Sequence, residues 1–232
     1  MTRNYKDITY ALARSDRKTA SIYIERNGNI TIQVPSSLTD TQIEALIESK
    51  RSWIYKGLAE WRDLNATRVE RAYVNGEGFL YLGRLYRLCL VEAQAESLLL
   101  KDGYFCLRAS GETTNLDTFS EAFKEFYRTK GLEKIPRRVS AYQAKMGVRV
   151  GEVKILDLKN RWASCSPSGN LNFHWKCMMA PPSIIDYIVV HELAHIRHPN
   201  HSHSFWNELD KILPDYRYRK DWLKINGAGM DL

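Results

Sequence analysis

The sequence has no apolar run near the ~18 uninterrupted residues that a membrane-spanning helix requires. Its first residues lack the apolar core of a signal peptide, so we expect a cytoplasmic protein with no membrane partner. Its four cysteines form no C-x-x-C pair, which favours buried thiols over disulfides or a zinc knuckle. There is no internal repeat and no low-complexity tract. With 232 residues, 44% of them hydrophobic, the chain is predicted to form one large globular domain or two small ones.

Histidine is absent from the first 173 residues, although the chain contains six of them. Five lie within thirteen residues near the end of the sequence: His191, His195, His198, His201 and His203. Histidines that merely decorate a surface would be scattered along the chain. This cluster therefore predicts a metal site or a proton-handling site.

The pattern predicts an α+β fold with a β-rich N-terminal region, residues 1–115, and a second region, residues 116–232. In the first region we expect strands at 8–13, 20–25 and 29–34, then a helix over 41–61 that begins with a capping box of Thr41 and Glu44. Four short strands should follow between residues 79 and 108.

The second region opens with a helical pattern over residues 116–147, which Gly131 and Pro136 are expected to divide into two helices. Three strands are predicted at 153–158, 161–165 and 170–175. Two helices should end the chain, one over 183–198 with a capping box of Ser183 and Asp186, and one over 202–213.

The segment His191-Glu192-Leu193-Ala194-His195 is an H-E-x-x-H motif, whose meaning depends on whether it lies on a helix. The apolar run before it and Pro199 after it predict a buried helix. Residues four apart then share one face, so both imidazoles can reach a single cation, with Glu192 beside it. The motif also arises by chance, and a buried polar network is the alternative. Burying these groups without a cation is costly, so we favour a metal.

A catalytic zinc usually has three protein ligands and a water, so a third ligand must come from outside the motif. On a continuous helix His198 would lie in line with the motif histidines, which suits a tetrahedral site poorly. His201 and His203 follow the turn at Pro199-Asn200, where the chain can return a side chain. The order of preference is His201, His203 and His198, with Glu208 as a weaker acidic alternative.

These residues resemble the YgjP-like metal-dependent hydrolases, a metallopeptidase family related to the SprT-like and WLM zincins. The matching stretches are Arg161-Trp-Ala-Ser-Cys-Ser, Ile185–His195, His198-Pro-Asn-His-Ser with Phe205-Trp206, and Leu213-Pro-Asp-Tyr with Trp222-Leu. The likeness is strongest over residues 159–225. It implies a zincin-like C-terminal part with a small antiparallel sheet, and a metal site completed at His201. Ala163 stands where the family has Gly, for which we expect only a slight change in the strand.

The motif and the resemblance together predict a zinc-dependent peptidase that holds one ion per chain and uses Glu192 as general base on a peptide or protein. Arg161, Trp162 and Ser164 are candidate substrate-binding residues, on a strand that could hold an extended peptide by β-addition. Packing is the alternative for them. His174 is expected to be a packed or capping histidine.

Charge leaves two other functions open. The formal net charge is +7, and residues 116–161 carry 11 basic and six acidic side chains. Such a stretch is either a solvated helix face or a basic surface for a nucleotide or nucleic acid. The same metal could then serve phosphoanhydride hydrolysis, or the chain could be a nucleic-acid-associated SprT-like protease. The lack of a P-loop argues against the first, and the lack of a zinc finger or helix-turn-helix against the second.

Overall fold

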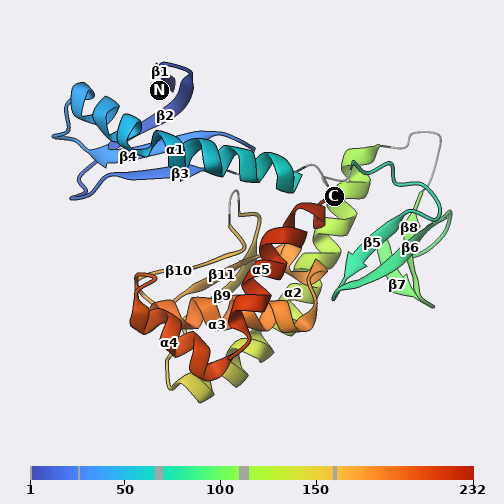
Figure 1. Cartoon of the computed structure of the whole chain (residues 1–232). Coiled ribbons are helices and arrows are strands. Elements are labelled where there is room, and N and C mark those ends of the chain that lie inside the picture. Colours follow the sequence, from blue (N-terminus) through green and yellow to red (C-terminus); the bar gives the residue numbers. More distant parts are fainter. Residues whose placement is uncertain (1, 26, 66–69, 110–114, 159–160) are drawn as a thin grey trace. The chain divides into compact units, whose positions relative to one another are not determined.

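The computed structural model describes residues 2–25, 27–65, 70–109, 115–158 and 161–232. These residues form α-helices and three small sheets, so the fold is α+β as predicted (Figure 1). None of the helices in the described ranges is long and apolar enough to cross a membrane.

Packing divides the chain into two units, Met1–Arg68 and Val69–Leu232. The boundary predicted between residues 115 and 116 lies inside the second unit, where one hydrophobic core includes side chains from both sides of it. Phe123, which follows that boundary, stacks on Phe79 at 4.2 Å and lies 5.2 Å from Phe105, ring centroid to ring centroid. The strands before residue 109 therefore share their core with the helix after residue 115.

The first unit is a four-stranded sheet with one helix, α1 (Asp40–Asn65). The strands lie in the order β1-β2-β4-β3, with bounds Thr2–Tyr5 for β1, Ile8–Ser15 for β2, Ser21–Ile24 for β3 and Ile30–Pro35 for β4. Alternate residues of the central strands join the helix in one core, made of Ile8, Tyr10, Ile30, Ile32, Val34, Ile43, Ile47 and Ile54. Strand β1 was not predicted, because its polar Thr-Arg-Asn-Tyr sequence lies at the sheet edge and buries none of its residues.

The start of α1 corrects the predicted capping box. Thr39 and Gln42 form the reciprocal pair: the backbone N–H of Thr39 donates to Gln42 Oε1 at 3.0 Å, and that of Gln42 to Thr39 Oγ1 at 3.3 Å. Thr41 and Glu44 had been assigned this role. The spacing of the motif is the same, but the capping residue lies two positions earlier, at Thr39, and the helix begins at Asp40 instead of residue 41.

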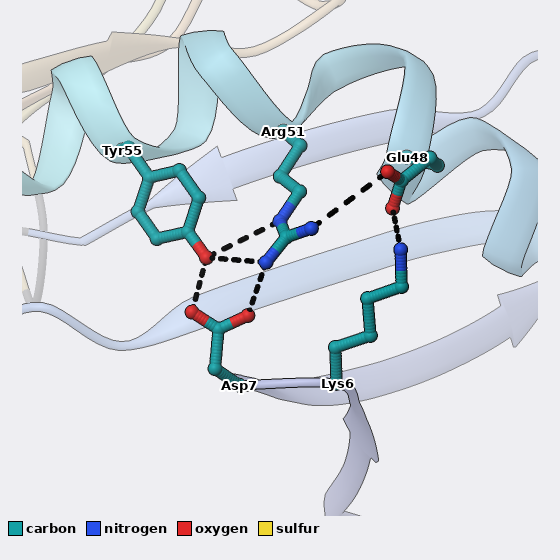
Figure 2. Close-up of polar contacts among 5 residues, drawn as sticks. All are labelled: Lys6, Asp7, Glu48, Arg51 and Tyr55. Carbon is teal, nitrogen blue, oxygen red and sulfur yellow. Dashed lines mark hydrogen bonds and ion pairs between the residues drawn. The ribbon is translucent and has the colours of Figure 1, made fainter.

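Exposed polar contacts connect α1 to the β1–β2 turn (Figure 2). Asp7 accepts hydrogen bonds from Tyr55 and from Arg51, the latter at 2.7 Å, and Lys6 donates to Glu48 at 3.0 Å. Because solvent screens the charges of these groups, each pair contributes little to stability. The buried face of the sheet, rather than this network, carries most of the stability of the first unit.

The second unit begins with a four-stranded sheet in the order β5-β6-β8-β7. The bounds are Gly78–Tyr81 for β5, Arg84–Val91 for β6, Leu98–Lys101 for β7 and Tyr104–Arg108 for β8, close to the prediction. Helix α2 (Leu116–Met146) packs its aromatic side chains into the same core. All four cysteines are free thiols. The expectation that they are buried holds for Cys177 alone, since Cys89, Cys106 and Cys165 are partly exposed.

Helix α2 is continuous, which corrects the predicted break at Gly131 and Pro136. Both residues lie inside the helix, and Gly131, Ile135 and Val139 are buried along its length. A Cβ on Gly131 would lie 3.1–3.3 Å from side-chain atoms of Ile155, so the missing side chain allows strand β9 (Val153–Leu156) to approach closely. Packing against the rest of the second unit outweighs the local helix-breaking tendency.

Gly131→Leu is expected to lower the free energy of unfolding by about 1–3 kcal/mol, because the new side chain overfills the contact with Ile155. Thermal or urea unfolding measures the change. Ser140→Leu is the matched control, since Ser140 is exposed on the same helix and should shift stability by less than about 0.5 kcal/mol. Equal effects of the two substitutions would show that the close approach at Gly131 is not needed for packing.

The third sheet has the order β10-β11-β9, with β10 at Ala163–Cys165 and β11 at Leu171–His174. The predicted antiparallel sheet is corrected to a mixed one, because β10 and β11 pair antiparallel whereas β11 and β9 pair parallel. Pairing partners of this kind depend on contacts distant in sequence, which alternation of apolar residues along one strand does not reveal.

The remaining helices follow this sheet: η1 (Trp175–Met179), α3 (Pro182–Arg197), α4 (His203–Ile212), α5 (Tyr216–Asn226) and η2 (Gly227–Gly229). No side-chain hydrogen bond caps α3, and Asp186 instead pairs with Arg138 of α2. This corrects the predicted Ser183–Asp186 capping box. Helix α5 was not predicted, since its Tyr-Arg-Tyr-Arg-Lys-Asp start is polar and only Tyr216 and Leu223 are buried.

Candidate metal centre

Helix α3 places His191, Glu192 and His195 at its C-terminal end. Apolar side chains ahead of and between them are buried, which holds the helix in the core of the second unit: Ile184, Ile185, Ile188, Val189, Val190, Leu193 and Ala194. The rings of His191 and His195 lie one helical turn apart, with centroids separated by 4.9 Å. The four-residue spacing therefore brings both imidazoles to one face of the helix, as binding of one metal ion by both rings requires.

His201 joins these two residues from the segment between α3 and α4. Its Nε2 lies 3.0 Å from Nε2 of His191, and its ring centroid lies 4.7 Å from that of His195. One ligand atom from each of the three histidines falls within 4.8 Å of the others. The structure thus brings together the three residues that the turn argument and the resemblance had selected.

The other candidate ligands have different partners. His203 Nδ1 lies 3.0 Å from Asn207 Nδ2, and the carboxylate of Glu208 pairs with Arg197 at 2.8 Å. His198 ends α3, and its backbone oxygen lies 3.2 Å from His195 Nδ1. A hydrogen bond to that oxygen leaves Nε2 of His195 available to a metal, as in the outer shell of many histidine sites.

Two of the three histidines are held in the form that binds a cation. Burial, with smaller contributions from neighbouring His195 and His201, lowers the pKa of His191 to about 3. Burial likewise lowers the pKa of His201. Both rings are therefore neutral near pH 7, which is the form that binds metal ions. In addition, Nδ1 of His191 is buried without a hydrogen-bond partner in the described part of the chain, so protonating this ring would bury an unpaired charge.

Glu192 is buried beside the histidines, with 6% of its surface exposed. It does not belong to the convergent ligand group. Burial raises the pKa of its carboxyl to about 7, and the charge of Arg161 opposes that rise. A carboxyl group next to the three imidazoles, yet outside their candidate ligand set, can act as a proton acceptor rather than as a ligand.

The three predicted substrate-binding residues have different surroundings. Arg161 is exposed just before β10, and its charge acts on Glu192. Trp162 packs against the core, and its backbone oxygen accepts from the N–H of His174 at 2.8 Å. Ser164 Oγ accepts from Asn172 Nδ2 at 3.3 Å across the β10–β11 pair. Of the three residues, only Arg161 is charged, and its charge acts on Glu192 of the candidate centre.

His174 is a capping histidine, in agreement with the sequence analysis. Its Nδ1 accepts from the backbone N–H of Lys176 at 3.1 Å at the start of η1. Its Nε2 lies 3.3 Å from Asp157. Burial lowers the pKa of His174 to about 4, so the ring is neutral and packed.

Aromatic residues of α4 and α5 support His201, a role that the sequence analysis did not assign to them. The ring of Trp206 stacks on His201 at 5.6 Å with a 22° interplanar angle. Tyr216 stacks on Trp206 at 5.4 Å and 19°. Lys220 Nζ lies 4.6 Å from the Trp206 ring centroid. Tyr216 and Lys220 are four residues apart and therefore share one face of α5. The sequence could have indicated this only if α5 had been predicted as a helix.

Three convergent imidazoles beside a buried carboxyl group form a donor set suited to a divalent metal and to hydrolysis. Comparison with known families agrees with this chemistry. The chain matches the family described as YgjP-like, metallopeptidase domain, over residues 18–226. It therefore belongs to the YgjP-like metallopeptidase-domain family, which supports a metal-dependent peptidase whose substrate is a peptide or protein.

Two solved structures are similar to part of the chain. The metallopeptidase zymogen of Pyrococcus abyssi abylysin is 27% identical, over 38% of this chain and 89% of that chain, with a TM-score of 0.36. The metallopeptidase zymogen of Methanocaldococcus jannaschii jannalysin is 24% identical, over 40% of this chain and 93% of that chain, with a TM-score of 0.35. No curated protein matches the chain.

Proposed function

We propose that the protein is a zinc-dependent peptidase that holds one ion per chain through His191, His195 and His201. The observation that carries this proposal is the convergence of the three imidazoles, whose ligand atoms lie within 4.8 Å of one another. Zinc suits the donor set because imidazole nitrogen is a preferred ligand and catalytic zinc takes three protein ligands with one open position. Membership of a metallopeptidase family supports the same assignment.

Zinc bound here would polarise a carbonyl and lower the pKa of a coordinated water toward ~7. Glu192 would take the proton of the attacking water and pass it to the leaving amine. Helix α3 holds this carboxyl group next to His191, and the side chain is buried. Burial therefore keeps the base from turning out into solvent. Arg161, exposed beside Glu192, would stabilise negative charge on the substrate oxygen.

Strand β10 supplies a place for the substrate backbone. It lies at the edge of its sheet, paired on one side to β11, and it packs against α3. An edge strand presents N–H and C=O groups to which an extended peptide can pair. We infer that a substrate peptide lies along β10, with Arg161 at one end of that strand.

Metal removal is the direct test. Purified protein should contain about one zinc per chain, and a chelator should abolish hydrolysis of an unfolded protein substrate, which added zinc should restore. Metal analysis and a peptide-release assay measure both effects. Nucleoside triphosphates are tested in parallel as the control substrate. A protein that takes up no transition metal, or that hydrolyses only the triphosphates, would contradict the proposal.

A further inference from the structure

Two cations approach the candidate metal centre from different elements. Lys220 on α5 places its Nζ 4.6 Å from the ring centroid of Trp206, and that ring stacks on His201. Arg161 lies directly before β10, and its charge acts on Glu192. Both residues are exposed. A substrate that reaches the three histidines can therefore contact Lys220 or Arg161 without displacing buried groups.

Neither cation has an ion-pair partner within 4.0 Å among the residues that the structure describes. On α4 and at the start of α5, Glu208 pairs with Arg197 at 2.8 Å and Asp215 with Arg219 at 2.9 Å. The exposed Asp210 and Asp221 on the same two helices form no ion pair with Lys220. The ammonium group of Lys220 is thus left to pair with a carboxylate from outside the chain.

The ring of Trp206 connects Lys220 to the candidate centre. Lys220 Nζ lies 4.6 Å from its centroid, and the same ring stacks on His201 at 5.6 Å and on Tyr216 at 5.4 Å. An ammonium group over this ring can act electrostatically on a charged group bound at the centre.

We propose that Lys220 binds an acidic residue of the peptide substrate on the His201 side of the candidate metal centre, and so makes the protein prefer Asp or Glu beside the cleaved bond. The inference rests on the proposed peptidase function. An ammonium group with no carboxylate partner attracts a carboxylate and repels a substrate lysine or arginine. Because Lys220 is exposed, its contribution is electrostatic selection of the substrate rather than support of the fold.

Binding of short capped peptides that differ only at their central residue, Glu or Gln, tests this inference. We would measure dissociation constants by calorimetry on zinc-loaded Glu192→Gln protein, which is expected to bind peptides without cleaving them. The Glu peptide should bind about fivefold more tightly than the Gln peptide, the upper end for an exposed charge pair. Lys220→Met should remove this preference, Lys220→Arg should keep it, and Lys220→Glu should reverse it.

Lys224→Met, one turn further along α5, is the matched control and should leave the preference unchanged. Equal binding of the two peptides before substitution, failure of both to bind, or a preference that survives in Lys220→Glu would overturn the inference. Melting temperatures of the four variants show whether each is folded. A preference that depends on Lys220 supports the inference even where the wild type cleaves neither peptide, whereas absent cleavage would overturn the proposed peptidase function instead.

Discussion

Replacing Glu192 by Gln is expected to leave zinc bound and the fold intact while hydrolysis falls by roughly 100- to 10,000-fold, the usual contribution of general acid–base catalysis. Gln keeps the shape of the side chain and removes its ability to accept a proton. The three histidines that form the ligand group are untouched, and Glu192 is not one of them. The loss should therefore appear in turnover and not in metal content.

A structural role for Glu192 makes the opposite forecast. Glu192 is buried. If it only stabilised the histidines, replacing it by Gln would lower the melting temperature or the zinc content. Activity would then fall only in proportion to the lost metal. Zinc content, melting temperature and turnover measured on one preparation separate the two cases. A stable, fully loaded Glu192→Gln protein with near wild-type turnover would remove Glu192 from the mechanism.

The second large effect is expected for the third ligand: His201→Ala should weaken zinc binding by more than about 100-fold, since loss of even an outer-shell partner costs 10–100-fold. His191 and His195 alone would hold the ion by two bonds on one helix face. His198→Ala and His203→Ala should change affinity far less. The side chain of His203 lies against Asn207 at 3.0 Å, and the contact of His198 to His195 uses its backbone oxygen, which Ala retains.

Competition with a zinc-binding dye, measured on all three variants, gives the affinities. Circular dichroism of the metal-free proteins provides the control, because a ligand variant should fold like the wild type before zinc is added. Equal losses in the three variants, or a loss confined to His203→Ala, would reverse the order of preference among the candidate ligands. Retention of tight binding in His201→Ala would require a ligand other than these histidines.

Features set by local spacing could be predicted from the sequence. An H-x-x-x-H spacing on any helix brings two imidazoles to one face, so a buried α3 was enough to pair His191 with His195. The turn at Pro199-Asn200 was enough to favour His201, which the structure brings within 3.0 Å of His191. Strand positions in the first two sheets, apart from β1, also followed, because alternating apolar residues and glycine turns are local signals.

Predictions failed where a local signal competes with packing. Gly131 and Pro136 ordinarily break helices, yet α2 continues through both because its buried face is held by the rest of the second unit. The capping boxes were misplaced for a related reason. Several Ser, Thr and acidic residues near a helix start satisfy the same spacing, and the final geometry selects among them, as Asp186 shows by pairing with Arg138.

Helix α5 shows most clearly what local patterns miss. Its sequence is too polar to signal a helix, and only Tyr216 and Leu223 are buried. Packing of Tyr216 on Trp206 nevertheless accompanies the placement of Lys220 over the Trp206 ring, which stacks on His201. No sequence periodicity connects residue 220 to residue 201. The position of Lys220 near the candidate centre could therefore be found only from the packing of the helices.

The sequence by itself determined the chemistry: which imidazoles can meet on one helix, which carboxyl group lies beside them, and which family the motifs resemble. These depend on helical periodicity and on residue type, which are properties of short segments. The tertiary structure decided the extent of the units, the mixed pairing of β9, β10 and β11, and the surroundings of His201. Those features join segments far apart in the chain, and burial and side-chain packing, rather than local propensity, set their energies.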